Sequence, residues 1–159
     1  MTRPSRISEQ TFDSLDAMMQ AWAAEAVRIA GEDHGMNLDF SAESIARLET
    51  VLAARSPIPV DQQDESTRLW GGYFGEVLRR RYDCHWIMAV YPGQSGLGQP
   101  SGQSGSGQEM AMPALDIRGS HVYPLLKVFR RITMGPAEDL SAFFAKVTAA
   151  LDANAQKKA

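Results

Sequence analysis

The chain lacks several features that would assign it quickly to a class of protein. Its 159 residues include one cysteine, Cys84, so an intrachain disulfide is impossible and a reducing, cytoplasmic compartment is the simpler expectation. No run approaches the roughly 18 consecutive apolar residues of a membrane-spanning helix, and the first ten residues lack the apolar body of a secretory signal. Basic residues show no surplus: 16 Lys and Arg against 19 Asp and Glu give a net charge of −3, which argues against a general nucleic-acid binder.

Recognisable ligand motifs are missing as well. The glycines of Gly71-Gly72-x-x-Gly75 do not follow a predicted strand, and no Gly-Lys-Ser/Thr ends the motif, so it is not a phosphate loop. His34, His85 and His121 have none of the spacings of metal-binding histidines, and there is no cysteine pair. We therefore predict neither a cofactor nor a metal site.

The length and the 44% hydrophobic content fit a single domain with a substantial core. Apolar periodicity predicts three N-terminal helices. The first runs from an N-cap at Ser8 to about Ala30 and stops at Gly31; the second begins after Ser41 and ends at Ser56-Pro57; the third spans about 65–82, after a linker over 60–64.

Two of these helices carry informative patterns. The first has an apolar stripe that predicts packing on the domain's own core, and a seam for a second chain is the alternative. The third combines a wide apolar arc with Gly71 and Gly75 beside it. Glycine in a helix interior costs about 0.5–1 kcal/mol relative to alanine. We therefore expect another backbone to approach the glycine face closely.

Beyond the third helix the pattern changes to that of strands. Residues 85–91 are apolar on both alternating faces, as in a central strand. A flexible Gly/Ser/Gln-rich loop is expected over 92–109, either as a disordered insert, which we favour, or as a functional flap. A second strand is predicted over 114–118, a tight turn at Gly119-Ser120 with glycine first, and a third strand over 121–123.

The remainder predicts one or two helices. Pro124 suits the first position of a helix with Leu125, Val128, Phe129 and Ile132 inward and Lys127, Arg130 and Arg131 outward, although a continued strand competes with this interpretation. The last helix should start near Glu138 and Asp139. Residues 1–7 and 152–159 should be loose termini. The fold class is therefore α+β: three N-terminal helices, a small antiparallel three-stranded meander, then one or two C-terminal helices.

Cys84 and His85 are the first candidates for chemistry. A cysteine nucleophile needs a histidine beside its thiol in space, and neighbouring strand residues point to opposite faces. His121 could reach Cys84 across the sheet. A small hydrolase or transferase using Cys84, His85, His121 or Glu76 is the enzymatic hypothesis; a small buried thiol is the simpler one.

A basic patch is the candidate binding site. Cations at the end of a helix are expected from the helix dipole alone, so a solvated helix end is the simpler interpretation. The functional hypothesis is an anion or acidic-partner site formed where two basic clusters meet. Its members are Glu76, Arg79, Arg80, Arg81, Lys127, Arg130 and Arg131.

Several short motifs are shared with a known pattern. They are Trp70-Gly71-x-Tyr73-x-Gly75-Glu76-Val77, a strand with Trp86, Tyr123-Pro124-x-x-Lys127-Val128, and Gly135-Pro136-x-Glu138-Asp139. Together they resemble a group of uncharacterised bacterial domains over about residues 40–151. The Gly/Ser/Gln-rich segment departs from the compact hairpin of that pattern. The resemblance implies one bacterial domain with this element order and supplies no activity or catalytic residue.

These observations favour a non-enzymatic protein-binding domain, for example an inhibitor or immunity-type partner of another bacterial protein. Such a role needs a complementary surface and no catalytic set. The alternatives are the small hydrolase or transferase and a self-associating structural or regulatory subunit that uses the first helix. Partners would be another protein or a second copy of the chain, with no membrane and no nucleic acid.

Overall fold

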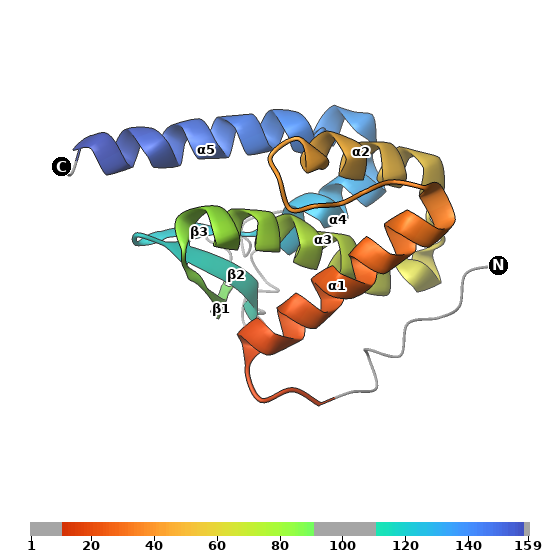
Figure 1. The fold of residues 1–159 in the computed structure, drawn as a ribbon, viewed down its shortest axis with the longest axis horizontal. Coiled ribbons are helices and arrows are strands. Elements are labelled where there is room, and N and C mark those ends of the chain that lie inside the picture. The colour runs from red at the N-terminus through yellow and green to blue at the C-terminus, as the bar shows by residue number, and fades with distance from the viewer. Residues whose placement is uncertain (1–10, 91–110, 158–159) are drawn as a thin grey trace, which may run out of the picture.

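The computed structural model describes residues 11–90 and 111–157, with side chains as far as residue 153, and it confirms the α+β element order (Figure 1). The predicted loose N-terminus at 1–7 and the predicted loop at 92–109 lie outside the described residues. The elements are α1 (Leu15–His34), α2 (Ser44–Arg55), α3 (Val60–Tyr82), β1 (His85–Val90), β2 (Ala111–Ile117), β3 (Ser120–Val122), α4 (Pro124–Met134), the 3₁₀ helix η4 (Pro136–Glu138) and α5 (Leu140–Lys157).

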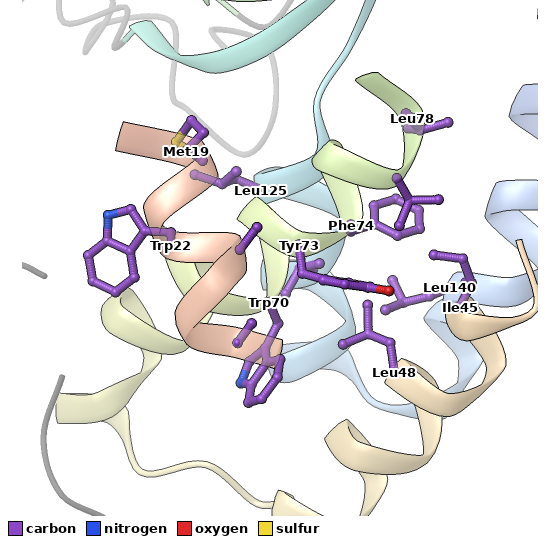
Figure 2. Packing of buried hydrophobic residues seen from close by; sticks show 14 of the residues in the cluster. Met19, Trp22, Ile45, Leu48, Trp70, Tyr73, Phe74, Leu78, Leu125 and Leu140 are labelled. Carbon is purple, nitrogen blue, oxygen red and sulfur yellow. The ribbon is translucent and has the colours of Figure 1, made fainter. Parts of the chain in front are cut away.

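Helix α3 is the centre of the fold, and α1 and α4 both pack against it (Figure 1). Its side chains Trp70, Tyr73 and Phe74 are fully buried, and Figure 2 shows them between residues of α1, α2 and α4. The apolar stripe of α1 contributes Met19 and Trp22 to this same core. The stripe therefore packs within its own chain, as the favoured interpretation predicted.

The glycines of α3 allow its neighbours to come close. A Cβ atom at Gly71 would lie 3.0 Å from the Cα of Leu125 in α4, which confirms the expected approach of another backbone at this position. At Gly75 the expectation was wrong in kind, because the space is filled by a side chain: a Cβ there would overlap the indole ring of Trp86. The Trp86 side chain thus packs strand β1 against α3 at Gly75.

The first helix begins and ends later than predicted. Residues 11–14 are not helical; Ser14 is the N-cap, and its side chain accepts a hydrogen bond of 3.0 Å from the Ala17 amide. Gly31 does not stop the helix. Gly35, at φ 62°, ends it instead, because its left-handed conformation lets the closing amides bond the last carbonyls.

The third helix begins earlier than predicted, at Val60, so the expected linker over 60–64 was wrong. Apart from the exposed Val60, this first turn and a half consists of polar residues, so it has no apolar periodicity that would predict a helix. Helix formation is favoured by Pro59 just before it and by Asp61 in the first turn. The second helix starts at Ser44, after a turn over residues 41–43.

The three strands form an antiparallel sheet in the order β1-β2-β3. β1 is therefore an edge strand, not the central strand that its apolar sequence suggested, and Trp86 is its one fully buried side chain. The central position belongs to β2, where Leu115 and Ile117 are buried. The tight turn consists of Arg118 and Gly119, both at positive φ, as a two-residue hairpin requires, so Ser120 belongs to β3.

The segment after β3 is a helix, as favoured, with Pro124 in its first turn. Three inward and outward assignments were wrong. Phe129, expected to face inward, is 38% exposed, whereas Arg131 and the Lys127 side chain, expected to face outward, are 2% and 12% exposed. The buried face follows positions 124, 128 and 131, which fall on one side of an α-helix, and the charge of Arg131 is matched by Glu49 on α2.

Helix α5 crosses beside α2 (Figure 1) and is helical through Lys157, beyond the end expected near residue 151. Asp139 is its cap and lies just before the helix: Oδ1 accepts a hydrogen bond of 2.7 Å from the Ser141 amide. Within the described ranges, no helix is long and apolar enough to cross a membrane.

Candidate functional site

Glu76 is the deepest member of the predicted basic patch, with a side chain that is 0% exposed. Arg79 donates to both of its carboxylate oxygens, at 2.7 and 2.9 Å, and the indole Nε1 of Trp86 donates at 2.8 Å. A buried carboxylate is tolerated because these charge-assisted bonds replace its hydration. Glu76 and Arg79 therefore join α3 to β1 and do not form an open binding site.

A hollow of about 280 Å³ lies beside the end of α3, and we call it the Arg80 pocket. Arg80 is 52% exposed, and its guanidinium carbon lies 3.5 Å from the ring centroid of Phe40. Stacking of this kind uses the face of the guanidinium and leaves its in-plane N–H groups able to bind an anion. The pocket is lined by Phe40, Ala42, Val77, Arg80, Arg81 and Phe144.

Phe40 is held in an uncommon backbone conformation. Its φ is 64°, in the left-handed region that a bulky side chain adopts at a cost of about 1–3 kcal/mol. The Phe40 amide donates to the Tyr73 hydroxyl at 2.8 Å, and the two rings lie 4.8 Å apart. The Tyr73 hydroxyl is also 2.6 Å from Ser44 Oγ, which donates to the Ser41 carbonyl, and burial raises the pKa of Tyr73. Phe40 is thereby fixed between the Tyr73 ring and Arg80.

The arginines at this end of α3 differ in how closely carboxylates hold them. Arg79 holds Glu76 with two hydrogen bonds and also feels the charge of Asp16, and Arg80 faces the Glu76 carboxylate at 4.0 Å. Arg81 pairs with Asp152 of α5 at 3.3 Å. Of the three, Arg80 has the longest contact with a carboxylate.

The basic residues of α4 lie elsewhere. Lys127 contacts Glu138 at 3.4 Å and lines a different hollow together with Arg130. Arg131 is buried against Glu49, with its Nη2 2.6 Å from Oε2, and the other oxygen of Glu49 accepts a hydrogen bond from the Leu140 amide. The seven residues of the predicted patch therefore do not form one site. Glu76 and Arg79 belong to a buried network, and Arg80 and Arg81 line the Arg80 pocket. Lys127 and Arg130 line a different hollow, and Arg131 pairs with Glu49.

The groups of the enzymatic hypothesis differ in exposure: Cys84 and Glu76 are buried, whereas His85 and His121 are exposed. Cys84 is buried, and desolvation raises the pKa of its thiol from 9.0 to about 11, with the charges of Asp16 and Glu76 acting in the same direction. His85 is exposed on the sheet and bonds Asp16 through Nδ1 at 2.8 Å. His121 is also exposed, on the edge strand β3, with its ring against Tyr123. A thiol with a raised pKa is a poor nucleophile at neutral pH.

The described part of the chain contains no group of three or more His, Cys, Asp or Glu side chains that could hold a metal ion. His34 lies 3.1 Å from Arg55, and burial together with that positive charge lowers its pKa. His34 is the last residue of α1 and contacts Arg55 of α2 at the end of that helix.

Sequence reasoning missed the aromatic half of the Arg80 pocket. Neither Phe40 nor Phe144 was predicted as a site residue, because apolar side chains next to or within a predicted helix are usually core residues. The sequence did contain one indication that Phe40 is not a helix residue. The residues Ser-Ala-Glu-Ser follow it and form a turn, so Phe40 lies outside the second helix. Its contact with Arg80 joins residues 40 positions apart, and no local pattern contains that information.

Comparison of the chain with family models, with curated proteins and with solved structures gave no match of any of the three kinds.

Proposed function

We propose that this protein is a non-enzymatic protein-binding domain whose Arg80 pocket receives an acidic segment of a partner protein. The observation that carries the proposal is the Arg80 guanidinium stacked on Phe40 beside a hollow that has both polar and apolar lining. Arginine and aromatic residues dominate the binding energy of protein interfaces, because they combine large contact area with directed hydrogen bonds.

The chemistry of the pocket supports an occupant with two parts. The in-plane N–H groups of Arg80 match the two oxygens of a carboxylate. Val77 and Phe144 form apolar walls that suit a neighbouring apolar side chain. The expected ligand is therefore a peptide segment in which an acidic residue stands next to an apolar one.

The conformation of Phe40 gives independent support. Backbone conformations as unfavourable as φ 64° for phenylalanine persist where the surrounding structure enforces them, and they concentrate at binding sites. Here the Phe40 amide donates to the buried Tyr73 hydroxyl, and the two rings are in contact. A pre-formed platform loses little conformational entropy when a partner binds.

The chain has no surplus of basic residues, which is untypical of a nucleic-acid binder and favours a protein partner. In its narrower form the proposal is that the domain acts as an inhibitor or immunity-type partner of another bacterial protein, in the cytoplasm. Small size, the single buried cysteine and the resemblance of the α3 motif to bacterial domains support this narrower form.

Selection from a random peptide library displayed on phage tests the proposal. The full chain serves as bait, and each enriched peptide is then measured against Arg80→Glu, Arg80→Gln and the matched control Arg68→Glu. Arg68 is an exposed arginine on the same helix and does not line the pocket. Unfolding curves of all variants establish that they are folded.

We expect enriched peptides that pair an acidic with an apolar residue, that bind Arg68→Glu unchanged and that bind Arg80→Glu at least about tenfold more weakly. A selection without such enrichment contradicts the proposal. Enriched peptides that bind Arg80→Glu as tightly as the parent protein do so as well.

A further inference from the structure

A second hollow, of about 180 Å³, lies where β3 leads into α4 and α5 passes alongside. Described side chains that line it come from all three elements, and none of them also lines the Arg80 pocket. We call it the Lys127 hollow; its principal residues are His121, Tyr123, Lys127, Arg130, Phe143 and Val147.

Lys127 supplies a largely buried positive charge to this hollow. Its side chain is 12% exposed, and Nζ lies 3.4 Å from Glu138 Oε1 and 5.2 Å from the ring centroid of Phe143. An ammonium group carries three protons, and a single carboxylate oxygen at that distance is a weak acceptor for one of them. The ammonium therefore retains capacity for a stronger anionic partner.

The walls of the hollow select for an apolar body attached to that anion. Phe143 and Val147 of α5 form one side, and Tyr123, with the His121 ring set edge-on at 6.4 Å, forms part of the other. Ligand pockets commonly measure about 300–1,000 Å³, so this smaller hollow has room for one ring and not for a nucleotide. A bare inorganic anion would leave the apolar walls uncovered.

We propose that the Lys127 hollow binds a small aromatic carboxylate, with Lys127 holding the carboxylate and with Phe143 and Val147 contacting the ring. Arg130 and His121 lie at the same hollow as further polar lining. Transfer of the ring from water to these walls and the charge-assisted bond to Lys127 supply the binding energy. The site is independent of the proposed protein-binding function, because it uses other residues.

Titration of the ¹⁵N-labelled full chain, followed by NMR, tests this inference with three probes. Benzoate has both the ring and the carboxylate, benzyl alcohol has the ring without the charge, and inorganic phosphate has charge without the ring. We expect benzoate to shift the amide signals of Lys127, Phe143 and Val147 saturably, and the other two probes to bind at least about tenfold more weakly.

Two variants act in opposite directions. Lys127→Met should weaken benzoate binding by about tenfold or more, whereas Glu138→Gln should tighten it by removing the competing carboxylate. Lys146→Met makes the same charge change at an exposed α5 residue outside the hollow and should bind as the parent does.

Absence of saturable shifts with benzoate at millimolar concentration overturns the proposal. Equal binding of benzyl alcohol or phosphate does so too, since one half of the recognition would then be unnecessary. If Lys127→Met fails to fold, Glu138→Gln decides, because unchanged or weaker benzoate binding in that variant contradicts the role of Lys127.

Discussion

Glu76 and Arg131 are charged side chains that the fold buries almost completely, each with a partner of opposite charge. Removing a charge from water is costly, and the cost is offset when hydrogen bonds satisfy the group from several sides. Glu76 meets this condition through Arg79 and Trp86, and Arg131 meets it through Glu49. Both charges therefore fix the positions of elements, which explains why neither is open to a ligand.

Gly75 provides a sharp test of packing at the scale of one residue. Gly75→Ala should destabilise the protein by about 1–3 kcal/mol or more, because the new methyl group overlaps the indole ring of Trp86, and the ring is held by its bond to Glu76. Urea unfolding of the two proteins measures the difference. Gly31→Ala is the matched control: a Cβ there meets no atom within 4 Å, so this helical alanine should be neutral or stabilising. Equal loss in both variants would show that helix α3 does not depend on close packing at Gly75.

Cys84 should react slowly in the native protein. Its thiol pKa is raised from 9.0 to about 11, so the reactive thiolate form is scarcer than in the unfolded chain at every pH below about 9. At about pH 8 the thiolate fraction should be about a hundredfold lower, and alkylation by iodoacetamide correspondingly slower, than in urea. The native rate should keep rising with pH up to about 11, where the thiolate becomes dominant. If the native protein is alkylated as fast as the unfolded chain at neutral pH, the thiol of Cys84 is reactive and the hypothesis of a cysteine nucleophile is supported.

Interactions between helices depend on side chains that are distant in the sequence. The Glu49 carboxylate of α2 accepts from Arg131 of α4 and from the first amide of α5, so one residue connects three helices. Arg131→Met should therefore destabilise the protein by about 3–5 kcal/mol, since it leaves Glu49 partly buried without its cation. Thermal unfolding checks this, with Arg68→Met as the exposed control. If Arg131→Met loses no more stability than Arg68→Met, the Arg131–Glu49 pair does not stabilise the packing of α4 and α5.

Sequence patterns predicted the elements that depend on local chemistry. The proline at 124 began a helix, the Ser56-Pro57 step ended one, and the apolar arc of α3 became the core. Predictions were wrong where a distant partner decides the result. β1 looked central because its residues are apolar, yet its place at the edge follows from the order of the meander.

The same reasoning explains how much of the site was foreseen. Arg80 and Arg81 were identified from the basic end of α3, because a run of like charge is visible in the sequence. The stacking of Arg80 on Phe40 and the burial of Arg131 follow from tertiary contacts across 40 and 82 positions. Local periodicity assigned Arg131 to the outer face of α4, because the spacing of residues along one helix contains no information on the Glu49 carboxylate of α2.

At the scale of the whole molecule, α5 borders both hollows. Phe143 lines the Lys127 hollow and Phe144 lines the Arg80 pocket, and the rings of both lie near the buried Phe74 ring, at centroid distances of 6.0 and 6.3 Å. The position of α5 on the α3 core therefore shapes the two candidate sites together. Arg80 itself is 52% exposed, but it lies 4.0 Å from the buried Glu76 carboxylate, so unfolding curves must accompany its charge reversal.

A charge-exchange experiment tests the role of the Arg80 pocket most directly. Calorimetry would measure an acidic peptide selected on the parent protein, and the same peptide with its acidic residue changed to lysine, against the parent protein and Arg80→Glu. We predict that Arg80→Glu binds the acidic peptide at least about tenfold more weakly and that the lysine peptide regains affinity for this variant. If Arg80→Glu binds the acidic peptide as tightly as the parent, or if the lysine peptide gains nothing, the Arg80 pocket does not receive an acidic partner.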